Sequence, residues 1–502
     1  MVKFLSPIKS SLTTKTTNRN FSRDREENFR FIVVATTRPE TMLGDTAVAV
    51  NPDDKRYKKL IGKKVILPLV NRKIPIIADR LVDAQFGTGA VKVTPAHDLT
   101  DYEIGQRHKL EICQVINEKG KITKESPIPY QGLKVLEARA KILEDLKNQG
   151  FLLKTEDFIH QIPKCYRCAT TVEPIPSWQW FLKMKKLAKM AEEPVKKGEI
   201  KFHPASFKKS YFEWLKNIKD WCISRQIWWG HKIPIKKEKD VLDTWFSSAL
   251  WPFAVLGWPK KTKDLKIFYP TDVLSTARDI INLWVARMIF SGKEFTKKIP
   301  FKDVYIHATV LTRRGERMSK SLGTGVDPIN LIKEYGADAT RFGIAYQIMG
   351  NQDIKFVEDN IVMGKKFCNK IWNASRFVLM NKPATIPKNL NQELKRIKNL
   401  SSADKEILNR LDKTIKSVNN DLKNFAFGKA AHTLYDFFWH DFCDRYIEEA
   451  KKQNDEKSKK ILRYILLNSM KLLHPFIPFI TEEIYQKLSG KNKCLMVEKW
   501  PI

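Results

Sequence analysis

The hydrophobic pattern changes along the chain, and this change excludes a single regular architecture. Between residues 31 and 93, short β-branched runs are separated by Pro, Gly, Asn and Asp, which indicates a β-rich domain. Helical patterns follow at residues 99–110 and 136–146, and residues 160–345 mix aromatic-rich stretches with further helices. From about residue 353 the apolar residues keep a helical spacing, as in the series Ile407, Leu411, Ile415, Val418 and Leu422. The pattern therefore predicts several domains of different class, with an all-α bundle at the end.

Composition excludes a disordered chain and a helical membrane protein. With 502 residues the chain is long enough for roughly three or four domains, and 43% hydrophobic residues supply their cores. No apolar run reaches the roughly 18 residues that a membrane-spanning helix needs. Seven cysteines in so long a chain favour a reducing compartment, so we expect a cytoplasmic location, with an organelle as the alternative.

The net charge favours a polyanionic partner. Ninety Lys and Arg residues against 56 Asp and Glu residues give +34. Such an excess is typical of proteins that bind nucleic acid. A lysine-rich genome that places Lys wherever a polar residue is tolerated is the alternative explanation.

Residues 1–30 differ from the remainder of the chain. They contain Ser, Thr, Asn and Lys, have no apolar periodicity, and include no acidic residue before Asp24. A transit peptide is one interpretation, but the segment lacks a clear amphipathic arginine face. We therefore expect a basic, disordered leader.

A glycine-flanked loop carries two cations and two hydroxyl groups in five residues. These residues are Arg317, Met318, Ser319, Lys320 and Ser321. Such a loop can close over a polyphosphate, and Lys320 can offset the charge that develops on the phosphates during displacement. Taken alone, the five residues could also form a generic basic surface loop.

Longer segments indicate a family. The loop resembles the K-M-S-K-S signature of class I aminoacyl-tRNA synthetases, and four segments follow in the order expected of valyl-tRNA synthetases: residues 220–234, 240–253, 279–292 and 317–328. Two segments are similar to the editing insertion of that family: residues 35–54 and 86–105. Three others are similar to its anticodon-binding bundle: residues 369–378, 435–444 and 474–485. The versions T-T-R-P-E-T and D-T-W-F-S-S-A favour the valine family over its isoleucine and leucine relatives.

The resemblance implies an α/β multidomain fold. We expect a β-rich editing domain at residues 31–160, the C-terminal half of a Rossmann-type class I catalytic domain at 161–350, and an all-α anticodon-binding helical bundle at 351–502. The implied reaction joins L-valine to tRNA(Val) through valyl-adenylate and uses ATP with Mg²⁺. A monomer without membrane contact is expected.

The implied editing site answers a physical problem. Val and Thr are nearly isosteric, so an apolar pocket rejects Thr poorly, and the valine enzyme is a standard example of this difficulty. The resemblance assigns the second, polar pocket to six residues: Arg38, Phe86, Lys92, Thr94, Asp98 and Asp101. It implies that Asp101 pairs with the α-ammonium group, that Arg38 and Lys92 hold the terminal adenosine or its phosphates, and that Thr94 with Asp98 contacts the side chain or positions water. Without the family, the two aspartates would be helix caps and the phenylalanine a core residue.

The implied synthetic site is incomplete. Asp279 resembles a ribose ligand, and Trp245 and Ile280 resemble residues on the valine side, while Lys320 is the phosphate cation. The second signature of the class, H-I-G-H, is not found before residue 31, and no coiled-coil arm follows the bundle. We therefore expect an N-terminally truncated member that is defective in amino-acid activation by itself, unless a separate chain supplies the H-I-G-H half.

Two substitutions and one cysteine pair depart from the family pattern. Ala277 and Ala308 stand where the family usually has Gly, and their methyl groups are expected to crowd the backbone that approaches ATP. Cys165 and Cys168 form a C-x-x-C pair, but tetrahedral zinc wants four ligands and the family's second pair is absent from the short I-K-K-E-K-D stretch. We expect a structural knuckle without metal, with zinc as the alternative.

Two other functions remain open. Residues 31–160 could act as a stand-alone hydrolase that deacylates Thr-tRNA. The whole chain could instead be a catalytically silent tRNA-binding protein that uses its basic surface and its bundle.

Overall fold

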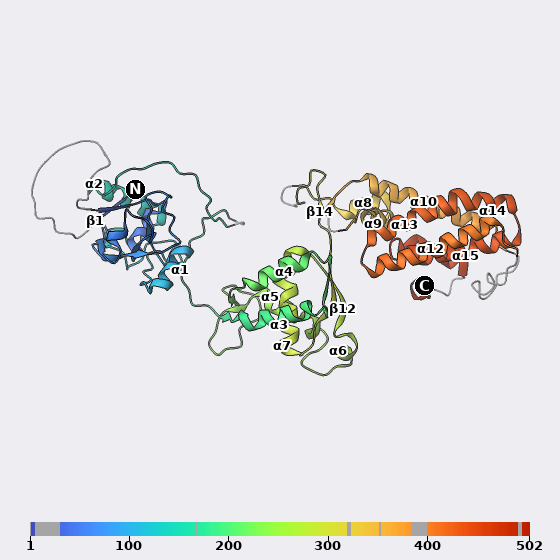
Figure 1. Cartoon of the computed structure of the whole chain (residues 1–502), viewed down its shortest axis with the longest axis horizontal. Coiled ribbons are helices and arrows are strands. Elements are labelled where there is room, and N and C mark those ends of the chain that lie inside the picture. Colours follow the sequence, from blue (N-terminus) through green and yellow to red (C-terminus); the bar gives the residue numbers. More distant parts are fainter. Residues whose placement is uncertain are drawn as a thin grey trace, which may run out of the picture. The chain divides into compact units, whose positions relative to one another are not determined.

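The computed structural model describes residues 2–5, 31–165, 168–318, 323–350, 353–383, 399–489 and 494–502. It divides into two compact units, Met1–Trp178 and Gln179–Ile502, and each is described by itself (Figure 1). In the described ranges, no helix combines the length and the apolar character needed to cross a bilayer.

The first unit is built on a six-stranded sheet. Its strands lie in the order β2 (Phe31–Val34), β1 (Val2–Leu5), β4 (Lys64–Ile66), β5 (Lys73–Ala78), β3 (Ala47–Val50) and β6 (Ala90–Val93). Neighbouring strands pair antiparallel except β3 and β5, which are parallel. The 3₁₀ helices η1 (Pro39–Gly44) and η2 (Lys58–Leu60) lie between strands in the chain, and η3 (Ile128–Tyr130) follows the last strand. The β-rich character predicted for this part of the chain is confirmed.

Two helices cover the two faces of this sheet, and both were predicted. They are α1 (Leu99–His108) and α2 (Val135–Asn148). The alternation along β3 explains the two layers, because Val48 and Val50 join the core beneath α2 whereas Ala47 and Ala49 join the core beneath α1. The small alanines leave room for the helix on their side.

The leader differs from the prediction at its first residues. Val2–Leu5 forms β1, which pairs along its length with β2 and through Leu5 with Ile66 of β4. The expectation of a disordered leader is therefore wrong for these four residues. A strand this short depends on its neighbours for hydrogen bonds, and local sequence carries no sign of them. Residues 6–30 lie outside the described residues.

The second unit begins with a parallel sheet. Its strands lie in the order β12 (Thr271–Thr276), β13 (Phe301–Ile306) and β8 (Lys201–His203). The helices of this part are α3 (Met184–Lys196), α4 (Phe207–Lys216), α5 (Thr244–Ala254), α6 (Lys263–Phe268) and α7 (Ala286–Phe295) (Figure 1). Helix α7 lies between β12 and β13 in the chain and packs on α3 and α5, as expected of a parallel crossover. The predicted Rossmann-type half is thus confirmed.

Several short elements complete this part of the second unit. They are β7 (Phe181–Leu182), β9 (Trp221–Cys222), β10 (Ser224–Arg225), β11 (Val241–Leu242), η4 (Arg278–Ile280), η5 (Ile281–Val285), β14 (Val310–Leu311) and β15 (Ile354–Lys355). The element η5 is π-helical.

The remainder of the second unit is helical, and from α10 (Asp359–Met380) onward it lies in the range 351–502 where the all-α bundle was predicted. Its elements are α8 (Pro328–Tyr335), α9 (Ala337–Tyr346), α10, α12 (Ser402–Lys423), α13 (Phe427–Asp436), the π-helical η6 (Phe437–Tyr446), α14 (Ile447–Gln453), α15 (Glu456–Leu473), α16 (Pro478–Ser489) and η7 (Leu495–Val497) (Figure 1). The predicted apolar face of α12 is buried, from Ile407 to Val418, in one core with α10, α13 and α15. Ser401 and Asp404 form a capping box that fixes the start of α12.

Candidate functional site

A buried polar cluster lies at the end of β6 in the first unit. Lys92 and Thr94 are two residues apart, so they share one face of the strand. The turn η1 brings Thr41 to this face, and Asp45 follows it directly. The Lys92 ammonium group donates to Thr41 Oγ1 at 2.9 Å, to Thr94 Oγ1 at 2.6 Å and to Asp45 Oδ1 at 3.3 Å. All three of its N–H donors therefore have acceptors within the cluster.

Asp45 was not predicted, although it lies within a segment that resembles the editing insertion. Its side chain is fully buried, and Oδ1 accepts from both Lys92 and the Thr94 hydroxyl, the latter at 2.5 Å. Burial raises the pKa of Asp45, and the nearby Lys92 partly offsets that rise. Among the described residues, Oδ2 has no hydrogen-bond partner. The cluster therefore keeps one acceptor that a hydroxyl or ammonium group could use.

Asp98 and Asp101 have different roles at the start of α1. Asp98 is exposed and caps the helix, since its Oδ1 accepts from the backbone N–H groups of Thr100 at 2.8 Å and Asp101 at 3.0 Å. Asp101 is buried, and its Oδ2 accepts from the Thr94 N–H at 2.8 Å. Burial raises the pKa of Asp101 to about 6, although the nearby Lys92 opposes this rise. The capping alternative thus holds for Asp98, whereas Asp101 joins the cluster.

Arg38 lies beside the loop that joins β6 to α1. Its Nη1 donates to the backbone carbonyl of His97 at 3.4 Å and its Nε to Glu40 at 3.1 Å, while Nη2 forms an ion pair with Glu173. Glu40 is fully buried and also accepts two hydrogen bonds from Arg139 of α2, at 2.8 and 2.9 Å. Three segments of the chain therefore hold the Arg38 side chain in place, through Glu40, His97 and Glu173. Two of these partners are carboxylates.

His97 forms hydrogen bonds between this loop and two later segments of the chain. Its Nε2 accepts from the backbone N–H groups of Val115 at 2.9 Å and Ile116 at 3.2 Å, and its Nδ1 donates to the Pro174 carbonyl at 3.2 Å. Burial lowers the pKa of His97 to about 4, so the ring is neutral at physiological pH. The contacts at Glu173 and Pro174 therefore join this later segment to the first compact unit, which extends to Trp178.

Phe86, like Asp98, is an editing candidate whose side chain makes no hydrogen bond to Lys92, Thr94 or the Asp101 side chain among the described residues. It is 64% exposed on a turn in which Gly89 N–H donates to the Phe86 carbonyl at 3.0 Å. The alternative of a core residue is therefore wrong. No hydrogen bond or ring contact among the described residues joins it to Lys92, Thr94 or Asp101.

On the synthetic side, the structure brings Asp279 and Arg317 together. Asp279 follows β12 in η4, and its half-exposed carboxylate forms an ion pair with Arg317. The parallel strands end at this place, where the His307 N–H donates to the Thr276 carbonyl at 3.0 Å. Met318 follows Arg317, whereas Ser319, Lys320 and Ser321 lie outside the described residues.

The two alanines that replace glycine occupy ordinary backbone. Ala277 is extended, with φ −90° and ψ 152°. Ala308 is not among the residues with positive φ. Alanine therefore causes no backbone strain at either position, and any crowding of ATP remains a prediction.

Trp245 and Ile280 are half-buried on adjoining elements. Trp245 lies in the first turn of α5, where its N–H donates to Asp243 Oδ1 at 3.1 Å. Ile280 ends η4 and precedes η5, which packs on α5 through a hydrogen bond from Trp284 Nε1 to the Ser248 carbonyl at 2.9 Å.

Asp243 was not predicted as a site residue, but its carboxylate contacts several side chains near Trp245. Its Oδ2 accepts from Trp221 Nε1 at 2.9 Å and from Arg225 at 2.8 Å. Arg287 lies 3.5 Å above the Trp221 ring and 3.5 Å from the same oxygen. Burial lowers the pKa of Arg287 to about 10, and its attraction to Asp243 opposes the change.

Cys165 and Cys168 lie in a hairpin of the first unit. The Ala169 N–H donates to the Cys165 carbonyl at 2.8 Å, and Cys168 Sγ donates to Thr170 Oγ1 at 3.2 Å. Within the described ranges, no three His, Cys, Asp or Glu side chains gather as a metal site would require. Residues 166 and 167 lie outside those ranges, and zinc stays an open alternative.

Comparison with known proteins identifies two family models along the chain. Residues 32–236 and 235–357 match the model of tRNA synthetases class I (I, L, M and V), and residues 404–502 match the anticodon-binding domain of tRNA ligases. A methionyl-tRNA synthetase of Mycobacterium tuberculosis, solved with methionyl-adenylate, has a similar fold with a TM-score of 0.55. It is 16% identical, and the match covers 68% of this chain and 69% of that one.

Curated relatives are much more similar in sequence. The valine–tRNA ligase of Clostridium tetani is 52% identical over 95% of this chain, and that of Thermotoga maritima is 50% identical over 95%. The chain spans 57% and 58% of the length of these two relatives. This chain therefore belongs to the class I tRNA synthetases of the I, L, M and V family, and it is similar in particular to the valine–tRNA ligases.

Proposed function

We propose that this chain serves the ligation of L-valine to tRNA(Val) with ATP and Mg²⁺, and that its first unit hydrolyses mischarged Thr-tRNA(Val). Identity of about half to valine–tRNA ligases supports the ligase assignment. Asp279 and Arg317, joined beside the ends of parallel strands, would meet the ribose and phosphates of ATP. Trp245 and Ile280 would lie on the valine side.

The observation that carries the editing proposal is the buried polar cluster around Lys92. A Thr side chain brings a hydroxyl group to this cluster, where Thr94 and the free Asp45 oxygen can bond to it. A Val side chain brings a methyl group instead, which gives no hydrogen bond to Asp45 Oδ2, the cluster atom without a partner among the described residues. A site built for a hydroxyl group rejects its apolar isostere far better than an apolar site rejects the hydroxyl.

The remaining residues supply orientation and charge. Asp101, ionised above about pH 6, would pair with the α-ammonium group of the aminoacyl ester. Arg38 would hold the terminal adenosine or its phosphate. Water then attacks the ester carbonyl, the bond to the ribose oxygen breaks, and that oxygen takes up a proton, which releases Thr and intact tRNA.

Two assays on the same 502-residue polypeptide test the proposal. We expect release of Thr from Thr-tRNA(Val) well above the spontaneous rate. Because the sequence contains no H-I-G-H segment, we expect no valine-dependent ATP–pyrophosphate exchange by this polypeptide alone, and adding a chain that carries the segment should restore exchange. Exchange by the polypeptide alone would refute the activation defect, and absence of Thr release would refute editing.

The same assays separate the two alternative functions. If the polypeptide releases Thr but does not ligate valine even when a chain with the H-I-G-H segment is added, a stand-alone editing hydrolase is favoured. The intact Lys92 cluster also supports that function. Salt-sensitive tRNA binding with neither activity would favour a tRNA-binding protein, which the charge of +34 supports.

A further inference from the structure

Two carboxylates contact the guanidinium group of Arg38 in the first unit. Its Nε donates to Glu40 at 3.1 Å, and its Nη2 forms an ion pair with Glu173. Glu173 lies outside residues 31–160, where the editing domain was predicted. A later segment of the chain therefore contributes a carboxylate to the surroundings of a candidate editing residue.

A second guanidinium group completes a network of four charged side chains. Arg139 of α2 donates to both carboxylate oxygens of Glu40, at 2.8 and 2.9 Å. Burial raises the pKa of Glu40, but the hydrogen bonds from Arg139 and the charges of both guanidinium groups outweigh burial and hold that pKa below its ordinary value. The two carboxylates therefore balance the positive charges of Arg38 and Arg139.

This network adjoins the Lys92 cluster. Thr41 Oγ1 donates to the Arg38 carbonyl at 3.0 Å, and the same oxygen accepts from the Lys92 ammonium group at 2.9 Å. Arg38 Nη1 also donates to the carbonyl of His97, in the loop that leads to α1, at 3.4 Å. Arg38 therefore lies beside the cluster to which the proposed function assigns the threonyl group.

Arg38 keeps two N–H groups for a ligand. A guanidinium group has five N–H bonds, and its contacts with Glu40, His97 and Glu173 use three of them. Among the described residues, no acceptor pairs with the other two. The Arg38 side chain is 28% exposed, so a ligand can reach these groups.

The balance of charge determines which part of a nucleotide suits these two N–H groups. The carboxylates of Glu40 and Glu173 contact the same guanidinium group, so they would repel a phosphate placed against it. A ribose hydroxyl or a ring nitrogen of adenine is a neutral acceptor and meets no such repulsion. The surroundings of Arg38 therefore favour the nucleoside over its phosphate.

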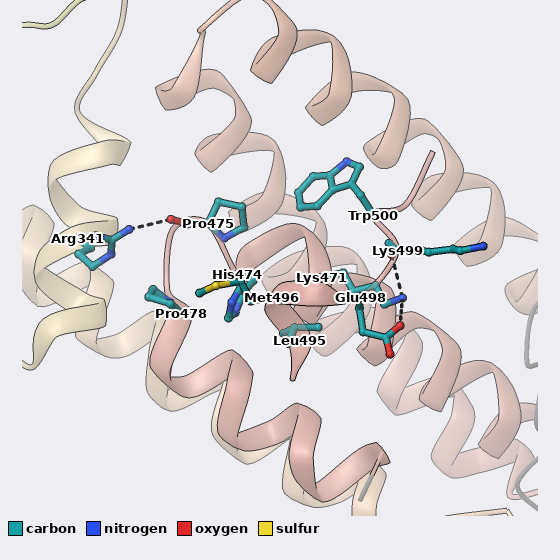
Figure 2. A pocket seen from close by; sticks show the side chains of 10 residues that line it. All are labelled: Arg341, Lys471, His474, Pro475, Pro478, Leu495, Met496, Glu498, Lys499 and Trp500. Carbon is teal, nitrogen blue, oxygen red and sulfur yellow. Dashed lines mark hydrogen bonds and ion pairs between the residues drawn. The ribbon is translucent and has the colours of Figure 1, made fainter. Parts of the chain in front are cut away.

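Arg341 of the second unit shows a different way to hold a guanidinium group. Figure 2 shows its hydrogen bond to the Pro475 carbonyl, which is 2.9 Å long, and the Phe476 carbonyl accepts a second one at 3.2 Å. Neutral carbonyls fix such a group without balancing its charge. The two carboxylates at Arg38 therefore do more than fix its position, because they also compensate its charge.

We propose that Glu173 is a positioning residue of the editing site, and that it holds the charge-balanced Arg38 toward the ribose or base of the terminal adenosine of tRNA. This inference rests on the proposed editing function and goes beyond it in two respects. It adds a residue from a later segment of the chain, and it assigns Arg38 to the nucleoside rather than to the phosphate.

Calorimetric titration of two nonhydrolysable analogues into the full chain tests the proposal. In threonyl-aminoadenosine an amide replaces the ester, and the second analogue carries an additional 5′-phosphate. We expect the unmodified chain to bind the two with affinities within a factor of about three, because the phosphate meets no uncompensated charge at Arg38. Glu173→Gln should weaken the binding of both analogues about tenfold, since a neutral acceptor holds a guanidinium group less firmly than a carboxylate does.

Two further variants make the measurement specific. Glu156→Gln is the matched control, because Glu156 is an exposed carboxylate of the same unit whose ion pair is with Lys154. The control should bind both analogues as the unmodified chain does. Arg38→Gln is an independent second variant, and it should weaken the binding of both analogues by the same factor. Circular dichroism before each titration checks that the variants are folded.

The outcomes separate this inference from the proposed function. The inference is overturned if neither analogue binds, if the 5′-phosphate strengthens binding tenfold or more, or if Glu173→Gln binds as tightly as Glu156→Gln. Release of Thr from Thr-tRNA(Val) together with any of these results would contradict the role of Glu173 alone. The predicted binding without release of Thr would support the role of Glu173 and contradict the proposed hydrolysis.

Discussion

Asp101→Asn should lower the rate of Thr release from Thr-tRNA(Val) about 100-fold at pH 7.5. The carboxylate is ionised at that pH and would pair with the substrate's α-ammonium group, and loss of a buried charged contact costs about 3 kcal/mol. The amide oxygen can still accept from the Thr94 N–H, which is 2.8 Å away in the unmodified chain. The fold of the loop should therefore survive, and single-turnover deacylation measures the effect.

The pH dependence provides a second measurement on the same variant. Since the pKa of Asp101 is raised to about 6, the rate in the unmodified chain should fall about tenfold per pH unit below that value. In the Asp101→Asn variant, this fall of the rate at low pH should be absent. Asp145→Asn is a suitable control, because Asp145 accepts a hydrogen bond from the Tyr130 hydroxyl at 2.7 Å in the same unit, away from the cluster. Equal losses in the two variants would contradict a direct role for Asp101.

His97→Ala should lower the free energy of unfolding of the first unit by about 3 kcal/mol. The substitution leaves the Val115 and Ile116 N–H groups without their acceptor and releases the Pro174 carbonyl. Each unsatisfied buried group costs about 1–3 kcal/mol. Chemical denaturation followed by circular dichroism at pH 7.5 measures the difference. His160→Ala is the control, since His160 is exposed, and it should change the free energy by less than about 0.5 kcal/mol.

The same variant should have a different pH dependence of stability. The pKa of His97 falls from 6.5 to about 4 on folding, so the unfolded chain binds more protons between these values. The contribution of the neutral His97 ring to the free energy of unfolding is fully present above pH 6.5. It is lost as the pH falls toward 4, by about 3 kcal/mol in all. Asp101 acts in the opposite direction, because its raised pKa lowers stability as the pH rises toward 6. The difference between the unmodified chain and His97→Ala isolates the histidine, and a difference that stays constant from pH 4 to 7 would contradict this assignment.

Regular patterns made much of the fold predictable. The helical series from Ile407 to Val418 is buried as expected, and the β-branched runs after residue 31 became strands of one sheet. Motif similarity also identified residues that the fold brings together, such as Lys92 with Thr94 and Asp279 with Arg317. These cases share a feature: the information lies within a short segment or within a signature that spans the site.

The features that could not be predicted depend on contacts between segments that are far apart in the sequence. Arg38 and Glu173 are 135 residues apart, and nothing local indicates their ion pair. Asp45 lies seven residues after Arg38, and only the turn η1 returns it to Lys92. The strand at Val2–Leu5 likewise depends on partners in β2 and β4. Asp45 could have been suspected as a carboxylate two residues before the apolar strand β3, but its burial could not have been predicted.

The selectivity of hydrolysis tests the central claim most directly. The measurement is the ratio of single-turnover deacylation rates for Thr-tRNA(Val) and Val-tRNA(Val) with the same polypeptide. If Lys92, Thr94, Asp45 and Asp101 form a pocket built for a hydroxyl group, the Thr ester should react at least about 100 times faster than the Val ester. Equal rates for the two esters would contradict it.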